Sequence, residues 1–369
     1  MTNASAGRAW ISHAIGEIEA DLSRSADTHL IRLDLPELSG ISVYLKDETI
    51  HPTGSLKHRL ARSLFLYGIC NGLITEGTPV VEASSGSTAI SEAFFARLLG
   101  LPFTAVLPRS TAPAKKRALK FAGAQVQEVD PGVDACVAAA ELARQVSGCF
   151  LDQFTYAERA TDWRGNNNIA ESLFNQMARE AHPAPAWVVV GAGTGGTSAT
   201  IGRYIRYRSG LAPHTRLCVV DPESSAFFPA FSSGQKDAVG RTSPVVEGIG
   251  RHRVEASFVA SVVDRMIQVP DAASVAAVLW LAKRTGRRFG PSTGTNIVGV
   301  LQLARELAKQ GQRGSIVTLG CDAGDRYAET VYDAGWNDRQ GLDLTPWSDA
   351  FGDFERTGVF KPVLPSATR

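Results

Sequence analysis

The sequence lacks several features that would assign it to a particular class of protein. No apolar run is long enough to span a membrane, and the first 25 residues carry Asp and Glu without an apolar core, so we expect neither a membrane anchor nor a signal peptide. The formal net charge of the 369-residue chain is only +1, which gives no electrostatic basis for binding nucleic acid or a membrane surface. A composition of 44% hydrophobic and 20% charged residues is typical of a globular protein large enough for two domains.

Cysteine and histidine are scarce and scattered. The five cysteines form no Cys-x-x-Cys pair and their number is odd, so we expect reduced thiols in a cytoplasmic protein. Cys321 follows an expected strand, and we expect it in the core. The histidines show no metal-ligand spacing, so the sequence predicts no metal site. His51 and His58 flank the motif described next, and we expect structural roles for them.

The most informative segment is Pro52-Thr53-Gly54-Ser55-Leu56-Lys57. It predicts a turn that opens a helix, with Lys57 in the first helical turn. The positive end of the helix dipole disfavours an ammonium there, so the pKa of Lys57 is expected to be lowered. A partly deprotonated lysine can form a Schiff base with an aldehyde. Taken alone, Lys57 could equally be a solvated surface lysine.

Two glycine- and serine-rich loops follow apolar runs and precede helical patterns. The loop Gly193–Thr197 brings backbone N–H groups to a helix start, as a phosphate site requires, although a tight turn without a ligand has the same pattern. The loop Ser84–Thr88 gathers hydroxyls and amides that suit a carboxylate, although Ser84 or Ser85 could simply cap the helix. Together with Lys57, these loops fit pyridoxal phosphate and an amino-acid substrate.

Strand-like runs alternate with helical patterns along most of the chain, which predicts an α/β fold with mostly parallel sheets. The strands are expected at 42–46, 79–83, 103–107, 125–128, 187–190, 216–220 and 315–319. The helices are expected at 55–70, 88–99, 112–121, 134–145, 169–178, 274–284 and 296–307. The segment 222–244 has little periodicity and is a candidate gating or dimer-contact loop. The tail carries aromatic residues from Trp336 to Phe360, which we expect to dock on the body or on a partner subunit.

These motifs, in this order, resemble the cysteine synthase and cystathionine β-synthase family of fold type II pyridoxal-phosphate enzymes. The resemblance implies two three-layer αβα domains of the tryptophan synthase β type: a smaller one at 46–154 and a larger one formed by 1–45 with 155–335, followed by an extension at 336–369. The cofactor is expected between the domains. Lys57 matches the Schiff-base lysine. The implied cofactor-binding residues are Lys57, Ser87, Gly193, Thr194, Gly195, Gly196, Thr197 and Ser292. The implied substrate-binding residues are Ser84, Ser85, Gly86, Thr88, Gln153 and Gly248.

One departure from the synthase pattern points to a branch of this family. Synthases usually carry asparagine in the carboxylate loop where this chain has Ser87, a shorter side chain. The amino-acid sequence of the segments 26–30, 55–59, 82–88 and 163–168 resembles the L-cysteine desulfhydrase branch. That resemblance implies elimination of sulfide from L-cysteine to give pyruvate and ammonia. The alternative is β-replacement on an activated serine. In either case it implies a cytoplasmic homodimer.

Overall fold

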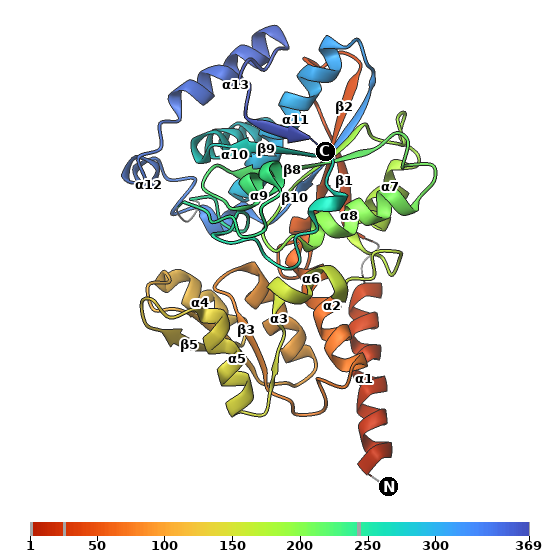
Figure 1. The fold of residues 1–369 in the computed structure, drawn as a ribbon, viewed down its shortest axis with the longest axis vertical. Helices are drawn as coiled ribbons and strands as arrows, with labels where there is room; N and C mark the ends of the chain where they lie inside the picture. Colours follow the sequence, from red (N-terminus) through yellow and green to blue (C-terminus); the bar gives the residue numbers. More distant parts are fainter. Residues whose placement is uncertain (1–2, 25–26, 242–244, 369) are drawn as a thin grey trace. The chain divides into compact units, whose positions relative to one another are not determined.

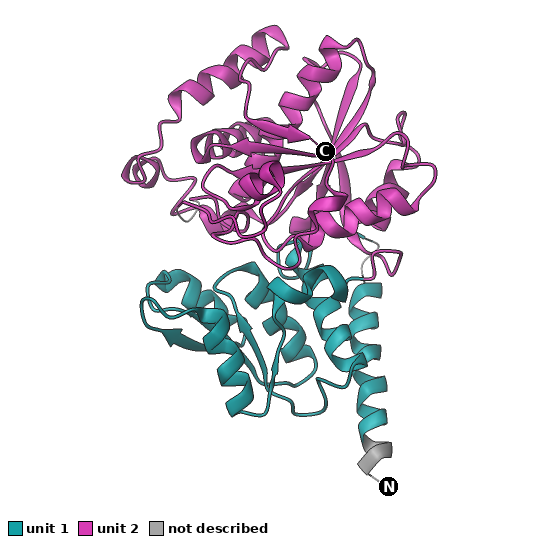
Figure 2. Cartoon of the chain, viewed as in Figure 1, with its two compact units in different colours: residues 1–27, 51–161 teal, residues 28–50, 162–369 magenta. Residues whose placement is uncertain are grey.

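The computed structural model describes residues 3–24, 27–241 and 245–368 (Figure 1). Ala26, quoted above for the desulfhydrase branch, and the last three residues of the 222–244 segment lie outside the described residues. The chain forms two compact units, which Figure 2 shows in different colours. The smaller unit consists of residues 1–27 and 51–161, and the larger unit consists of residues 28–50 and 162–369.

The smaller unit is built on a four-stranded parallel sheet in the order β5-β4-β3-β6. Its strands are β3 (Val80–Ala83), β4 (Phe103–Pro108), β5 (Gln125–Val129) and β6 (Cys149–Phe150). Its helices are α1 (Asn3–Ser23), α2 (Lys57–Cys70), α3 (Ser87–Leu98), α4 (Pro113–Phe121), α5 (Ala135–Gln145) and α6 (Gln153–Ala160). Asp134 and Asp152 cap α5 and α6 by accepting hydrogen bonds from the first backbone amides of each helix.

Both faces of this sheet are buried, because successive strand residues point to opposite sides. Val80, Ala105 and Leu107 belong to a core that includes residues of α1, α2 and α3. Their neighbours Val81 and Val106 belong to a second core that includes residues of α5. The unit therefore has three layers, with the sheet in the middle.

The larger unit is built on a seven-stranded sheet in the order β1-β2-β10-β7-β8-β9-β11, parallel except for β1 and β11 at its edges. The strands are β1 (His29–Leu33), β2 (Ile41–Asp47), β7 (Trp187–Gly191), β8 (Arg216–Pro222), β9 (Arg265–Val269), β10 (Gly314–Gly320) and β11 (Ser366–Thr368). The α-helices are α7 (Ile169–Met177), α8 (Gly196–Tyr207), α9 (Phe227–Ser233), α10 (Asp271–Thr285), α11 (Pro291–Lys309), α12 (Ala334–Arg339) and α13 (Thr345–Thr357). Short 3-10 helices occupy η1 (Glu48–Ile50), η2 (Ala260–Val262) and η3 (Gly324–Tyr327).

Helix α11 lies directly on the larger sheet. A Cβ atom at Gly299 would stand 2.4 Å from Val220 Cγ1 and 3.2 Å from Val189 Cγ1, so glycine allows the helix to approach β7 and β8 closely. Val188 and Val190, which point to the opposite face, are also fully buried, and α8 packs against β7 and β8. The mostly parallel, three-layer α/β architecture predicted from the sequence is confirmed.

The division of the chain differs from the predicted one at both ends. Residues 1–27 cluster with the smaller unit, because Ala14 and Ile18 of α1 are buried in the core that α2 and α3 form. The tail is part of the larger unit rather than a separate extension. Phe351 stacks on Trp280 of α10 with ring centroids 5.1 Å apart, and β11 pairs with β9. The expected docking of the aromatic tail on the body is therefore observed within this chain.

Candidate active site

The lysine motif forms a turn and a helix start in the smaller unit. Gly54 has a φ of +69°, and its amide donates to His51 O over 2.7 Å. Lys57 is the first residue of α2, where the sequence placed it, and its side chain is half-buried. Its backbone amide donates to Ser55 Oγ over 3.3 Å, so the start of the helix is bonded locally. Lys57 thus lies in the first turn of α2, where the helix N–H groups have no partner within the helix.

The predicted carboxylate loop lies between β3 and α3. Helix α3 begins at Ser87 with Gly86 as its N-cap, and no side chain caps it. Ser84 Oγ accepts a hydrogen bond from the Gly86 amide over 3.3 Å, so neither serine plays the helix-capping role considered above. A helix start without a side-chain cap leaves its first amides able to bind an anion.

Hydrogen bonds connect this loop with the lysine motif and with α6. Thr53 Oγ1 lies 2.9 Å from Ser91 Oγ, and Ser91 Oγ donates to Ser87 O over 2.9 Å. Thr88 Oγ1 donates to Gln153 Oε1 over 2.8 Å, and both side chains are buried. The smaller unit therefore brings together the predicted residues Lys57, Ser84, Ser85, Gly86, Ser87, Thr88 and Gln153.

The histidines beside Lys57 have structural partners. His58 is buried, its Nδ1 lies 3.3 Å from Thr53 Oγ1, and its Nε2 lies 3.2 Å from Asp21 Oδ2 of α1. Its ring stacks on His51 with centroids 5.0 Å apart. His58 thus links α2 to α1, in line with the structural role expected for it.

Two buried carboxyls near these loops were not predicted. Glu82 lies in β3, and Glu92 lies in α3 five residues after Ser87. Both are 0% exposed. The only sequence signal was an acidic residue inside each of two apolar runs, which ordinarily indicates a solvent-facing position.

The predicted phosphate loop connects β7 to α8 in the larger unit. Gly195 is the N-cap of α8 with a φ of +93°, a left-handed conformation that favours glycine. Gly195 has no side chain that could cap the helix. The hydroxyl of the preceding residue, Thr194 Oγ1, accepts a hydrogen bond from the Gly196 amide over 3.2 Å. The loop thus presents the remaining amides at the positive end of α8.

The surroundings of this loop explain its glycines. A Cβ at Gly193 would stand 2.3 Å from Gly248 O, and a Cβ at Gly195 would stand 2.5 Å from Phe258 Cα. Both neighbours are backbone atoms, which cannot rotate away. The Gly250 amide donates to Ala192 O over 2.8 Å. The larger unit therefore brings the predicted residues Gly193, Thr194, Gly195, Gly196 and Thr197 together with Gly248.

Ser292 lies at the start of α11 and is 4% exposed. Its hydroxyl lowers the pKa of the Cys321 thiol, which follows β10, against the larger effect of burial. Because β10 and β7 are parallel neighbours, Ser292 and the phosphate loop belong to the same edge of the sheet. Burial is the main cause that raises the pKa of Cys321 to about 12, so this thiol is not a nucleophile at neutral pH.

A carboxyl that the sequence did not indicate also lies beside Ser292. A Cβ at Gly290, the N-cap of α11, would stand only 1.9 Å from Asp322 Oδ1. Asp322 Oδ2 accepts a hydrogen bond from Tyr327 Oη over 2.7 Å, and Asp322 is buried. The surroundings of Ser292 are therefore more acidic than the serine alone suggested.

The donor set of the two units fits the cofactor that the motifs imply. A phosphate needs several N–H donors and a positive potential, which the start of α8 offers. An aldehyde needs an amine, which Lys57 carries, and a carboxylate needs hydroxyls and amides, which the Ser84–Thr88 loop carries.

The chain belongs to the pyridoxal-phosphate-dependent enzymes. The model of the family described as "Pyridoxal-phosphate dependent enzyme" matches residues 24–322, most of the chain. Its cofactor is accordingly pyridoxal phosphate.

Two relatives and one solved structure are similar to this chain over most of its length. An L-cysteine desulfhydrase, Cds1 of Mycobacterium tuberculosis, is 58% identical over 357 residues, which cover 96% of each chain. An N-(2-amino-2-carboxyethyl)-L-glutamate synthase of Ralstonia nicotianae is 31% identical and covers 80% of this chain and 83% of its own length. Among solved structures, a hydrogen sulfide-producing enzyme of Fusobacterium nucleatum is similar with a TM-score of 0.78 at 22% identity, covering 96% of this chain and 99% of its own. At that identity it shows the fold alone.

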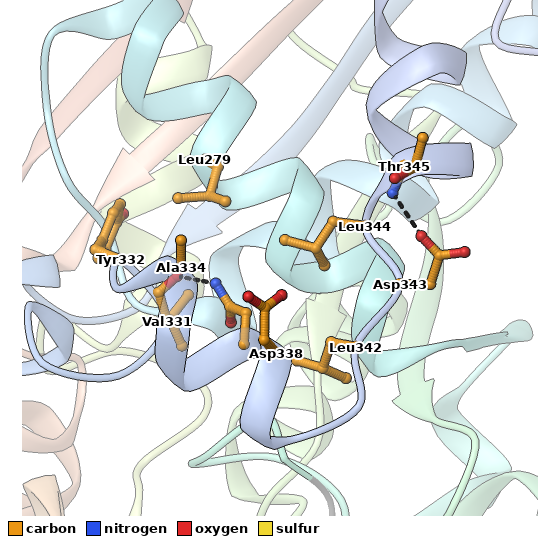
Figure 3. Close-up of a pocket in the computed structure, with 10 residues that line it drawn as sticks. Leu279, Val331, Tyr332, Ala334, Asp338, Leu342, Asp343, Leu344 and Thr345 are labelled. Carbon is orange, nitrogen blue, oxygen red and sulfur yellow. Dashed lines mark hydrogen bonds between the residues drawn. The ribbon is translucent and has the colours of Figure 1, made fainter.

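A cavity of about 370 Å³ lies elsewhere in the larger unit (Figure 3). Its lining comes from α10 and from the segment 331–345, and includes Leu279, Leu342, Leu344 and Asp338. It contains none of the predicted site residues.

Among the described residues, no three His, Cys, Asp or Glu side chains are grouped to hold a metal ion, and no helix is long and apolar enough to cross a bilayer.

Proposed function

We propose that this protein is an L-cysteine desulfhydrase, which converts L-cysteine and water into hydrogen sulfide, pyruvate and ammonia. The observation that carries the proposal is the 58% identity to an L-cysteine desulfhydrase over 96% of both chains. The lysine motif and the two loops each lie at the start of a helix, α2, α3 and α8, which supports the proposal.

When bound, pyridoxal phosphate supplies an aldehyde for covalent attachment and a ring that accepts the electron pair left by the departing α-proton. In our proposal, Lys57 Nζ would hold the cofactor, and the same amine would take the α-proton of the substrate. The amides of Gly193–Thr197 hold the phosphate. The loop Ser84–Thr88, backed by Gln153, holds the substrate carboxylate and orients the α-carbon.

Ser292 is proposed as the neutral partner of the ring nitrogen. A hydroxyl stabilises a protonated ring nitrogen less than a carboxylate does, so Ser292 would leave the ring nitrogen unprotonated and make the cofactor a weaker electron acceptor. Asp322 lies close to Gly290, so this region also contains a carboxyl group.

The second candidate is β-replacement on an activated serine. It is favoured by the synthases among the relatives, including cysteine synthases of Dictyostelium discoideum and Aquifex aeolicus, each 29% identical to this chain. Elimination and replacement share the attachment lysine and the removal of the α-proton. They differ in whether water or a second substrate finishes the reaction.

One experiment separates the two. The purified enzyme is incubated with L-cysteine alone, or with O-acetylserine plus sulfide, and pyruvate, sulfide and cysteine are quantified. We expect pyruvate and sulfide in equal amounts from cysteine alone. Efficient synthesis of cysteine with little pyruvate from cysteine would refute the desulfhydrase assignment.

The role of Lys57 is tested by Lys57→Ala, with Lys120→Ala, which alters an exposed lysine of α4, as a control for the loss of a lysine. Lys57→Ala is expected to lose turnover by several orders of magnitude, because the attachment group and the base are the same residue. The wild-type enzyme is treated with borohydride, and mass spectrometry should then find the cofactor on Lys57. Attachment to another lysine would refute the assignment.

We also propose that the protein is cytoplasmic and forms a homodimer. The mass of the protein in solution would test the homodimer.

A further inference from the structure

The buried carboxyl of Glu82 lies next to the start of the predicted carboxylate loop. Glu82 is in β3, one residue before the strand ends at Ala83, and it is 0% exposed. A buried carboxylate that water cannot reach needs hydrogen-bond donors from the protein. Each of its oxygens has a backbone donor: Glu82 Oε1 accepts from the Ala83 amide over 2.7 Å, and Glu82 Oε2 accepts from the Gln153 amide over 3.1 Å.

The hydrogen bond to Gln153 continues the pairing of two strands beyond its last backbone bond. Strands β3 and β6 are parallel neighbours, and after β6 the Leu151 amide donates to Val81 O over 3.1 Å. The chain then turns at Asp152, whose φ of +47° is left-handed and unfavourable for a residue with a side chain. The Glu82 carboxyl therefore holds the chain immediately after this turn.

Gln153 in turn contacts the far end of the carboxylate loop. It is the first residue of α6, and its Oε1 accepts from the Thr88 hydroxyl over 2.8 Å. Thr88 is in the first turn of α3, where the loop that begins after Ala83 ends. Hydrogen bonds therefore connect the two ends of the loop through Glu82 and Gln153. All of these side chains are buried, so water does not compete with their hydrogen bonds.

We propose that Glu82 is a positioning residue for substrate binding, whose carboxylate fixes the two ends of the carboxylate loop relative to each other. The proposal rests on the proposed function, because it requires the loop Ser84–Thr88 to hold the substrate carboxylate. A loop that is already ordered binds an anion more tightly, since it loses less conformational freedom on binding. Because Glu82 is fully buried, it acts through Ala83 and Gln153 and not by touching the substrate.

The charge of Glu82 determines the pH at which the proposal is tested. Burial raises the pKa of Glu82 to about 7, while the Gln153 and Ala83 amides lower it. The carboxylate form therefore predominates at pH 8, and all of the following measurements are made at that pH.

The variant Glu82→Gln tests the proposal with little change in shape. A side-chain amide has only one oxygen, so at one of the two positions an NH2 group faces a backbone N–H, and the connection between Ala83 and Gln153 is broken. The visible absorbance of the cofactor reports the binding of two amines to the holoenzyme. L-Alanine carries a carboxylate but no leaving group, and ethylamine is the same molecule without the carboxylate. Glu76→Gln, which alters an exposed glutamate of the same unit, is the control.

The expected result is a loss of affinity that depends on the carboxylate of the ligand. Glu82→Gln should raise the Kd of L-alanine about tenfold, the effect of losing about one hydrogen bond to a charged group, and leave the Kd of ethylamine unchanged. Glu76→Gln should leave both values unchanged. Equal weakening of both amines by Glu82→Gln would indicate general damage to the site. That result, or an unchanged Kd for L-alanine, would overturn the proposal.

Thr88→Val provides a second test, because it breaks the same path at its other end. If Glu82 acts through Gln153 and Thr88, the two changes are coupled. The double variant Glu82→Gln/Thr88→Val should then raise the Kd of L-alanine by clearly less than the product of the two single effects. An effect equal to that product would show that the two residues act independently, contrary to the proposal.

A measurement on the wild-type enzyme serves if Glu82→Gln does not fold. L-Alanine should slow hydrogen exchange of the Ala83 and Gln153 amides, because the bound carboxylate makes opening of the loop more costly, and ethylamine should not. The same exchange rates with both ligands would contradict the proposal. Failure of the proposed function is distinguishable, because L-alanine binding requires no reaction. An enzyme that releases no sulfide from cysteine could still show the carboxylate-dependent effect of Glu82→Gln.

Discussion

Asp221 should make the larger unit less stable as the pH rises from 5 to 8. This aspartate lies at the end of β8 and is 0% exposed. Its Oδ2 accepts from the Phe228 amide over 2.8 Å, and its Oδ1 has no hydrogen-bond partner among the described residues. Burial raises the pKa of Asp221 from 3.8 to about 7, although hydrogen bonds from Ser225 and Phe228 oppose the shift.

The sign and size of the effect follow from linkage. Between pH 4 and 7 the folded state retains a proton on Asp221 that the unfolded state releases, so stability falls as the pH rises. From pH 5 to a folded pKa of about 7 the change covers two pH units, or about 3 kcal/mol at roughly 1.4 kcal/mol per unit. Asp221→Asn abolishes this contribution. Relative to wild type, the variant should therefore gain about 3 kcal/mol between pH 5 and pH 8.

The assay is hydrogen exchange of the β8 amides, supported by urea unfolding, at both pH values. The comparison uses the difference between variant and wild type, so the contributions of Glu82 and Glu92, which are present in both proteins, cancel. Asp237→Asn, which alters an exposed aspartate on the loop after α9, serves as control. If the difference between Asp221→Asn and wild type is the same at pH 5 and pH 8, Asp221 is ionised throughout and the reasoning is wrong.

Three further changes test the packing and the site. Gly195→Ala would force a Cβ to 2.5 Å from Phe258 Cα at a φ of +93°, so we expect at least a tenfold loss of cofactor affinity in equilibrium dialysis, and unchanged retention would contradict the phosphate assignment. Phe354→Ala empties a fully buried position and should lower the free energy of unfolding by about 3–5 kcal/mol; a cost below about 1 kcal/mol would mean that the tail is not docked in solution. Thr88→Val removes the 2.8 Å hydrogen bond to Gln153, and steady-state kinetics should show a raised KM for cysteine with the fold intact; an unchanged KM would separate this pair from substrate binding.

The core strands β2, β7, β8 and β10 could be predicted because their signal is local, whereas the buried strand β9 was not predicted. In β7 and β10 a short run of apolar residues is buried on both faces, and both predicted ranges differ from the observed ones by a single residue at one or both ends. Helix α11 begins five residues earlier than predicted, because Pro291 is well suited to the first turn of a helix and Gly290 forms its N-cap. Local chemistry was enough to locate the loops that open α2, α3 and α8, whereas α6 and α9 were not predicted.

The environment of the site could not be predicted in the same way. Glu82 looks like an exposed position in an apolar run, and its carboxyl instead accepts the amide of Gln153 in α6, an element that is distant in the sequence. Asp322 likewise reaches Gly290 only because β10 lies beneath α11. The assignment of α1 to the smaller unit also depends on tertiary contacts, since Ala14 and Ile18 are buried by helices that follow later in the chain.

The path of the chain through the two units has a consequence for synthesis on the ribosome. All residues of the smaller unit precede residue 162, so this unit can close its core while the rest of the chain is still being made. The larger sheet cannot do so, because β2, which is made early, pairs along its length with β10, Ile41 lying opposite Gly314. Until β10 emerges, β2 can pair with β1 on one side only, and its other edge is left unpaired, where it can pair with other chains. The nascent chain therefore passes through a long interval in which one unit is folded and the other is vulnerable to aggregation.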